Sequence, residues 1–191
     1  MTRRQVIGFV VVLSLIAVGL LVKSRTGDAE PADALGTLRE AAALEPCPSG
    51  VGSGLPDLRL PCLGGGSAVP LRTAGPGTPM LVNMWATWCR PCVAEVPVLV
   101  AFAAKAAGKV RVLGVDTEDE SDKALTFAAQ YGMHYPSVVD VDGRLLRAYG
   151  GGPPVTLFVD AGGQVTHVEH GQVDSVPELE KLVATHLGVR L

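Results

Sequence analysis

Two cysteines, Cys89 and Cys92, lie at a spacing that suits thiol–disulfide chemistry. Arg90 and Pro91 separate them, and an apolar stretch at residues 80–85 precedes them. If that stretch is a strand and a helix follows, Cys89 lies at the helix N-terminus, where free N–H groups and the helix dipole stabilise a thiolate. Cys89 would attack a substrate disulfide, and Cys92, one turn later, would resolve the mixed disulfide.

Other uses of this cysteine pair fit less well. A structural zinc site with four cysteine ligands wants two close pairs, whereas Cys47 and Cys62 are fifteen positions apart. Haem attachment requires a histidine after the second cysteine, and this position is Val93. A purely structural disulfide at this junction would be strained and exposed. We therefore expect a redox pair that needs neither a metal nor an organic cofactor.

The surrounding pattern alternates between strands and helices. Apolar runs predict strands at residues 80–85, 110–115 and 137–140, with helices from the cysteine pair to 107 and over 121–131. A glycine turn at 162–163 predicts a hairpin of residues 155–160 and 164–170. Ser175 and Glu178 form a capping-box pattern that opens a last helix. This order predicts an α/β fold with a mixed central sheet.

Residues 82–92, VNMWATWCRPC, resemble the active-site strand and motif of the thioredoxin superfamily. Residues 95–97 (EVP), 131–143 and 154–160 resemble its membrane-anchored extracytoplasmic branch, the TlpA/ResA/CcmG-like thiol–disulfide oxidoreductases. The resemblance covers residues 55–191 and implies a thioredoxin-like three-layer sandwich. We also expect one transmembrane helix before it.

The resemblance implies roles for residues around the cysteines. Pro154 would be a cis-proline that faces the disulfide and aligns an extended substrate. Cis bonds before proline cost little free energy, and where they occur they serve a defined structural purpose. The alternatives are an ordinary trans Pro-Pro turn or a cis bond at Pro153 instead. Trp88, Arg90, Pro91 and Pro153 are expected to contact the substrate.

Glu95 is the candidate proton acceptor of the site. It follows Cys92 by three positions, so both lie on one helical face. Asn83 stands where cytosolic thioredoxins usually carry a buried aspartate, and an amide cannot titrate. A partly buried Glu95 would accept the Cys92 proton and tune the thiols. The alternative is a solvated helix glutamate without a redox role.

Cys47 and Cys62 form a second pair outside the shared motif. An even cysteine count in an exported protein favours pairing. We expect a structural disulfide that ties the N-terminal segment to a first hairpin, which two short strands around the glycines 64–66 would form within residues 55–71. A redox relay with the Cys89–Cys92 pair, or two free thiols, are the alternatives. A disulfide here fits only outside the cytosol.

An uncharged apolar run extends from Val6 to Val22, with two basic residues on each side. As a helix of about 25 Å it just spans a bilayer core. We expect residues 1–25 to be a membrane anchor or uncleaved signal, residues 26–54 a linker and residues 55–191 the thioredoxin-like domain on the extracytoplasmic side. The alternative is a secreted protein after cleavage of a signal peptide.

The charge balance excludes nucleic-acid partners. The chain of 191 residues carries a net charge of −3, from 16 basic and 19 acidic residues. Without the four basic residues that flank the apolar run, twelve basic residues oppose nineteen acidic ones, a net charge of −7. An acidic body of this kind lacks the basic surface that binds phosphate backbones.

Together these patterns predict an extracytoplasmic, membrane-tethered thiol–disulfide oxidoreductase. The resemblance implies a reductant of protein disulfides, for example of apocytochrome c cysteines before haem attachment, with electrons from a transmembrane thiol carrier. An oxidant or isomerase for exported proteins is the first alternative. A redox-inert or copper-handling binding module is the second.

Overall fold

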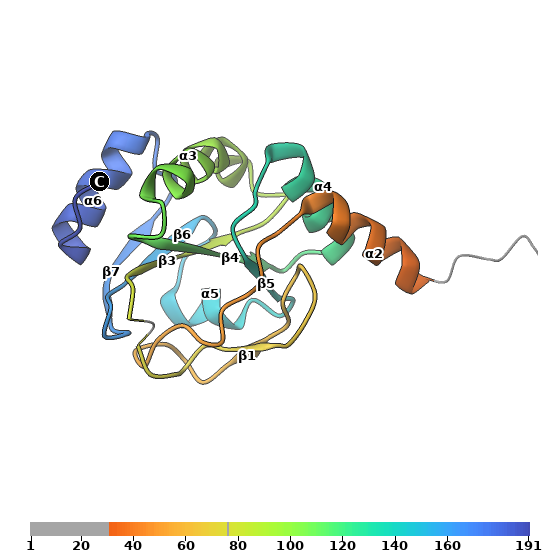
Figure 1. The fold of residues 1–191 in the computed structure, drawn as a ribbon, viewed down its shortest axis with the longest axis horizontal. Coiled ribbons are helices and arrows are strands. Elements are labelled where there is room, and N and C mark those ends of the chain that lie inside the picture. Colours follow the sequence, from red (N-terminus) through yellow and green to blue (C-terminus); the bar gives the residue numbers. More distant parts are fainter. Residues whose placement is uncertain (1–30, 76) are drawn as a thin grey trace, which may run out of the picture. The chain divides into compact units, whose positions relative to one another are not determined.

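A five-stranded mixed sheet forms the centre of the molecule, in the order β5-β4-β3-β6-β7 (Figure 1). In the computed structural model, which describes residues 31–75 and 77–191, β3 (Met80–Trp85) is the middle strand. It pairs in parallel with β4 (Arg111–Thr117), which pairs in parallel with β5 (Ser137–Asp140). On the other side β3 pairs antiparallel with β6 (Val155–Val159), and β6 pairs antiparallel with β7 (Val165–His170). The predicted mixed sheet is confirmed.

Three helices cover one face of this sheet: α3 (Arg90–Ala106), α4 (Ser121–Tyr131) and α6 (Val176–Leu187) (Figure 1). Their buried side chains share one apolar cluster with Leu81 and Trp85 of β3. Ser175 caps α6 by accepting a hydrogen bond from the Glu178 N–H, as the capping-box pattern predicts.

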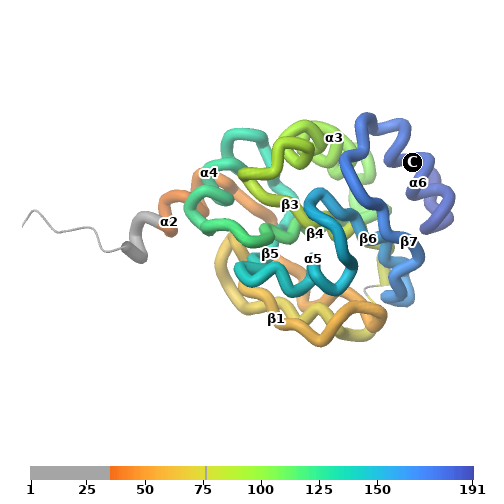
Figure 2. The backbone as a smooth tube through the Cα atoms, turned by 180° about the vertical axis from the view of Figure 1, so that it is seen from behind, coloured from red at the N-terminus to blue at the C-terminus, as the bar shows by residue number. Residues whose placement is uncertain are grey.

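The opposite face is covered by α5 (Arg144–Tyr149) and by a two-stranded sheet of β1 (Arg59–Leu60) and β2 (Val69–Pro70) (Figure 2). These elements pack on Val82 and Met84 of β3. Since successive side chains of a strand point to opposite faces, β3 contributes to both clusters and all six of its residues are buried. The fold is therefore the predicted three-layer sandwich.

Helix α5 has no counterpart in the sequence-based prediction. It has six residues, too few for an apolar period to be visible. A tertiary feature fixes its start instead, because the buried carboxylate of Asp140 accepts a hydrogen bond from the Leu145 N–H at 2.7 Å. Gly143 provides the left-handed turn before it, with φ +62°.

The N-terminal segment packs on the sandwich earlier in the chain than the predicted domain start at residue 55. The compact unit extends over Leu35–Leu191. Helix α2 (Pro31–Ala42) contributes Ala42, which is fully buried, and Val51 is buried as well. Residues 35–54, which were predicted to be a linker, are thus part of the folded body. Their apolar side chains pack against residues distant in the chain, so this burial was not visible in the local sequence pattern.

The apolar run from Val6 to Val22 lies outside the described residues. Over residues 31–75 and 77–191, no helix is both long enough and apolar enough to cross a membrane. The membrane anchor therefore stays a prediction.

A disulfide joins Cys47 to Cys62 beside the outer edge of the sheet. Cys62 forms a β-bridge with Val138 of β5, and the Leu63 N–H donates to the Ser137 carbonyl at 2.8 Å. The segment around Cys62 therefore extends the sheet past β5, and the disulfide fixes the preceding loop to that edge.

Asp116, near the end of β4, is a fully buried carboxyl group. Neither of its oxygens has a hydrogen-bond partner among the described residues. Burial, and to a smaller extent the nearby charge of Asp119, raise the pKa of Asp116 from 3.8 to about 8. The protonated form of Asp116 is therefore favoured in the folded chain at neutral pH.

We expect the Cys47–Cys62 disulfide to stabilise the fold strongly. It closes a loop with a sequence separation of 15, which in the chain-entropy model corresponds to about 3 kcal/mol. Replacing both cysteines by alanine should lower the free energy of unfolding in urea by roughly that amount. The matched control replaces Cys89 and Cys92, whose separation is only 3. An equal or larger loss in the control would contradict the prediction.

We expect Asp116→Asn to change how stability depends on pH. Because the folded-state pKa of Asp116 is raised, its favourable contribution is complete below pH 4 and is lost as the pH rises from about 4 through about 8. The asparagine variant has no such loss. Its free energy of unfolding should therefore gain on the wild type steadily over this range in urea titrations. The exposed control Asp122→Asn should give no such trend, and a parallel pair of curves for Asp116→Asn would refute the assignment.

Candidate active site

The Cys89–Cys92 disulfide lies at the N-terminus of α3, directly after the buried strand β3. Cys89 is the N-cap residue, and its sulfur accepts a hydrogen bond from the Cys92 N–H at 3.2 Å. Cys89 is 4% exposed and Cys92 1%. Cys89 is thus slightly more exposed than Cys92, and its sulfur occupies the position where a helix N-terminus stabilises negative charge.

Pro153 and Pro154 reach the disulfide because of the sheet register. Met84 of β3 pairs with Val155 at the start of β6, so the residues before Val155 meet the loop that follows β3. The Pro153–Pro154 peptide bond is cis. The carbonyl oxygen of Pro153 lies 3.3 Å from the Cys89 sulfur. A thiol at this sulfur can donate to that carbonyl, whereas in the disulfide the two atoms are only in contact.

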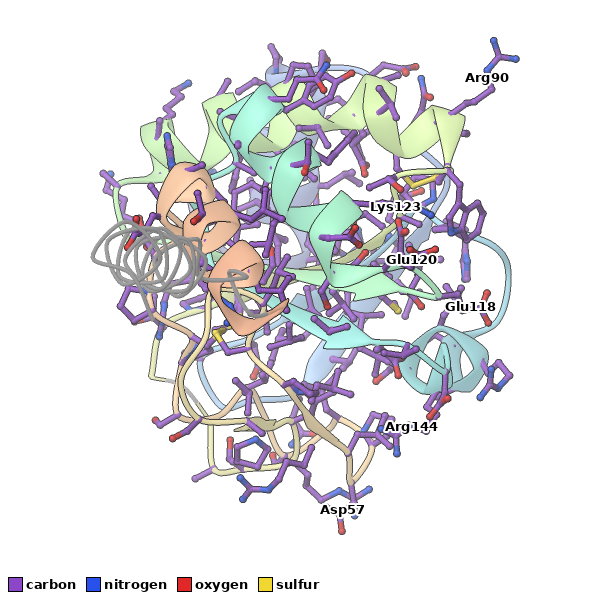
Figure 3. The ribbon with its side chains drawn as sticks, turned by 90° about the vertical axis from the view of Figure 1, so that its right-hand side faces the viewer. Asp57, Arg90, Glu118, Glu120, Lys123 and Arg144 are labelled. Carbon is purple, nitrogen blue, oxygen red and sulfur yellow. A yellow bond between two sulfur atoms is a disulfide. The ribbon has the colours of Figure 1, made fainter. Side chains whose placement is uncertain are left out.

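The exposed rim of the site consists of Trp88, Arg90 and Pro91. Trp88 is 54% exposed, and its indole N–H donates to the carbonyl oxygen of Glu118 at 3.1 Å. Arg90 extends from the start of α3 away from the body (Figure 3). These exposed side chains flank Cys89 in the chain, so a partner that approaches Cys89 from solvent would meet them.

Glu95 lies inside the core, three positions after Cys92 in α3. It is 1% exposed, so it is not a solvated helix glutamate. One carboxylate oxygen accepts the Val173 N–H at 2.9 Å, and the other accepts the side-chain amide of Asn83 at 2.9 Å. Asn83 also donates to the hydroxyl of Thr156 at 2.9 Å. The carboxylate is therefore anchored to α3, β3 and the segment after β7.

Opposing effects set the proton affinity of Glu95. Burial dominates and raises the pKa, while the hydrogen bonds from Val173 and Asn83 lower it and the charge of Glu169 raises it again. The result is a pKa of about 7, against an ordinary 4.5. Near neutral pH the group is close to half ionised, so it can both accept and release a proton.

The acidic residues after β4 have contacts that the sequence analysis missed. Acidic residues just before a helix are ordinarily solvated, yet one oxygen of Asp119 accepts both the N–H and the hydroxyl of Thr87, each at 2.6 Å. Asp116 was missed as well. The available signal for Asp116 was an acidic residue directly after the apolar run VLGV of residues 112–115. Asp119 has no local signal, because its partner lies 32 positions away.

The second disulfide is not part of this site. Cys47 packs against the face of the sheet opposite to Cys89 and Cys92. No group of three histidine, cysteine, aspartate or glutamate side chains is arranged to hold a metal ion within the described part of the chain. The site thus consists of one disulfide, a cis-proline backbone, a buried carboxyl group and an exposed tryptophan.

Comparisons with known proteins agree with this geometry. The family model described as Redoxin matches residues 50–183. The chain is 35% identical over 113 residues to the thiol:disulfide interchange protein DsbE homolog of Paracoccus denitrificans, covering 54% of this chain and 61% of the relative. It is 32% identical over 123 residues to the thiol-disulfide oxidoreductase ResA of Geobacillus thermodenitrificans, covering 63% and 70%.

A solved structure of a secreted Mycobacterium tuberculosis disulfide oxidoreductase, described as homologous to Escherichia coli DsbE, is similar as well. It superposes with a TM-score of 0.58 at 25% identity, covering 68% of this chain and 96% of that one. The chain spans about three fifths of the length of the DsbE homolog named above. The family match covers well over half of the chain and includes every residue of the site, so the chain belongs to the Redoxin family, with the thioredoxin-like fold.

Proposed function

We propose that this protein is a thiol–disulfide oxidoreductase in which Cys89 and Cys92 alternate between a dithiol and a disulfide. The observation that carries the proposal is the Cys89–Cys92 disulfide at the N-terminus of α3, opposite the Pro153 carbonyl. A disulfide in this position joins neighbouring residues of one helix turn and constrains little of the fold, so its formation and cleavage are compatible with repeated cycling.

The reaction conserves electrons and protons through two exchange steps. The Cys89 thiolate attacks one sulfur of a substrate disulfide, so a mixed disulfide forms and the first substrate thiolate leaves. The Cys92 thiolate then attacks the Cys89 sulfur, and the second substrate thiolate leaves. The substrate gains two electrons and two protons, and Cys89–Cys92 becomes a disulfide. A dithiol donor must reduce this disulfide before the next turnover.

Two features support Cys89 as the attacking residue. Cys89 is 4% exposed against 1% for Cys92, and its sulfur accepts a hydrogen bond from the Cys92 N–H. A thiolate there gains from that hydrogen bond and from the dipole of the 17-residue helix α3, whose first turn contains no acidic residue.

Glu95 is suited to serve Cys92 rather than Cys89. The two residues are three positions apart on α3 and both are buried. A base buried on the same helical face can accept the proton of a buried thiol without help from bulk solvent. With a pKa of about 7, Glu95 can take the Cys92 proton during resolution and return it when the disulfide is reduced.

The substrate side of the site suits an extended polypeptide. The backbone before Pro154 lies beside the Cys89 sulfur and can pair with a strand that carries a disulfide. Trp88 offers an exposed aromatic surface at the same place, with Arg90 and Pro91 next to it. Protein disulfides are therefore the proposed substrate class.

The finer proposals rest on the family resemblance and on the N-terminal sequence. They are a reductive direction, apocytochrome c as an example of a client, and a transmembrane thiol carrier as electron donor. The uncharged run from Val6 to Val22 supports an anchor that holds the domain on the extracytoplasmic side. A Cys47–Cys62 disulfide is in keeping with that oxidising compartment.

The central test replaces each cysteine of the pair in the full chain. Cys89→Ser should abolish insulin reduction with dithiothreitol and form no mixed disulfide. Cys92→Ser should also lose turnover but accumulate a mixed disulfide through Cys89, visible on non-reducing gels. A wild-type chain that neither reduces insulin nor yields this adduct would favour a redox-inert binding module. The reduction potential separates the directions, since about −270 mV is typical of thioredoxin and about −120 mV of a strong oxidant.

Glu95→Gln tests the proton acceptor. In the wild type, resolution of the mixed disulfide should accelerate as the pH rises through about 7, because the ionised carboxylate is the active form. The glutamine variant should lose this rise and resolve on the order of a hundredfold more slowly at pH 7.5. Rapid-quench thiol trapping measures the step. Glu40→Gln, an exposed helix position, is the matched control. If Glu95→Gln kept the wild-type pH profile, Glu95 would have no role in proton transfer.

A further inference from the structure

The turn that follows β4 holds the loop that carries Cys89. We call residues 118–120 the acidic turn; Figure 3 shows Glu118 and Glu120 on the side of the molecule where α3 begins. Three hydrogen bonds connect this turn to residues 87–88. The N–H and the hydroxyl of Thr87 both donate to one oxygen of Asp119, and the Trp88 indole N–H donates to the Glu118 carbonyl. The loop directly before Cys89 is thus fixed from one side by a single turn.

The Asp119 carboxylate is itself held in place. Its second oxygen accepts the Glu120 N–H at 2.8 Å, so both oxygens are used. The two bonds from Thr87, at 2.6 Å each, are hydrogen bonds to an anionic acceptor, which are shorter and stronger than those between neutral groups. Thr87 therefore has one defined position relative to β4.

Glu118 adopts a conformation that nothing local favours. Its φ is +52°, in the left-handed region that costs a non-glycine residue free energy. Its N–H donates to the Asp140 carbonyl at 3.1 Å, and its carboxylate lies 3.6 Å from the Arg147 guanidinium. A Cβ on Gly143 would come within 2.5 Å of that carboxylate, so the glycine makes room for it. Contacts with β5 and α5 thus hold Glu118 with its carbonyl toward Trp88.

Trp88 is exposed and yet oriented. More than half of its surface is open to solvent, while its indole N–H is bound. A fixed aromatic ring offers a partner a large apolar contact at low entropic cost. Because Trp88 adjoins Cys89 in the chain, the orientation of the ring and the position of the sulfur are set together.

We propose that Asp119 is a positioning residue that, through Thr87, presents Trp88 and Cys89 together to a polypeptide substrate. The inference rests on the proposed exchange reaction and adds a specificity device to it. A small disulfide needs only the Cys89 sulfur, whereas a protein disulfide must also fit the indole. Loss of Asp119 should therefore slow exchange with proteins far more than exchange with a small reagent.

The decisive experiment compares Asp119→Ala with Asp119→Asn in the full chain, at pH 6.5, where Asp116 is protonated because its pKa is about 8. Asp119→Ala should lower kcat/KM for insulin on the order of tenfold, because the Trp88 indole is then no longer held in the orientation that a polypeptide must fit. Its exchange with oxidised glutathione should change by less than about threefold. Asp119→Asn keeps an oxygen that can accept from Thr87, and should recover most of the rate with insulin.

Two further measurements separate positioning from general damage. Iodide quenching of tryptophan fluorescence reports on Trp88, since Trp85 is buried, and it should increase in Asp119→Ala. Thr87→Val should reproduce part of the insulin defect, and Asp119→Ala should then cost less in that background than in the wild type. Asp122→Ala, an exposed acid at the start of α4, is the matched control and should leave both substrates and the quenching unchanged.

The outcomes are distinguishable. Equal losses with insulin and glutathione, or fully additive effects of the Thr87 and Asp119 substitutions, would overturn the positioning role and leave the proposed function intact. A wild-type chain without any exchange activity would overturn the proposed function and this inference with it. A loss confined to insulin, restored by asparagine, is the expected result.

Discussion

The architecture depends on keeping one sulfur atom, that of Cys89, at the start of α3 and against the backbone of Pro153. Strand β3 supplies the fixed base, because all six of its residues are buried and it is paired on both sides. The antiparallel pairing with β6 brings Pro153 to the same end of the sheet, while the parallel pairing with β4 brings Asp119 there from the other side. A mixed sheet is therefore what lets two distant segments meet at one helix N-terminus.

Two buried carboxyl groups in this region show which physical effect dominates. In both Glu95 and Asp116 burial outweighs every other influence and raises the pKa. Two hydrogen bonds to the Glu95 carboxylate stabilise its charged form and offset part of the effect of burial, so its pKa rises only to about 7. Asp116 has no such bonds among the described residues and reaches about 8. Because Asn83 is neutral, Glu95 keeps its bonding partner without a second charge. The network of Glu95, Asn83 and Thr156 thus contains one titratable group, whose pKa lies near neutral pH.

Local patterns made much of this structure predictable. The helix at residues 121–131 and the strand at 137–140 have the bounds that their apolar spacing indicates, and the motif around Cys89 and Cys92 placed the site at the end of β3. What escaped prediction depends on contacts distant in sequence. The start of helix α5 is fixed by the buried Asp140, which accepts a hydrogen bond from the Leu145 N–H. Asp119 has the sequence surroundings of a solvated acid, and only the fold brings its hydrogen-bond donor Thr87 to it. The early start of the folded body has the same cause, since Val51 becomes core only once the sheet has formed.

The two disulfides differ in what they constrain, and this difference lets one chain be both stable and redox-active. Cys47–Cys62 spans a separation of 15 and fastens a segment that pairs with the edge strand β5, so its loss would free both the loop and an open sheet edge. Cys89–Cys92 spans only 3 positions within one helix turn. Opening it releases little chain entropy, because its loop is short and both cysteines also pack in the apolar cluster of α3 and β3. Thiol–disulfide exchange at Cys89 and Cys92 can therefore proceed while the rest of the chain stays folded.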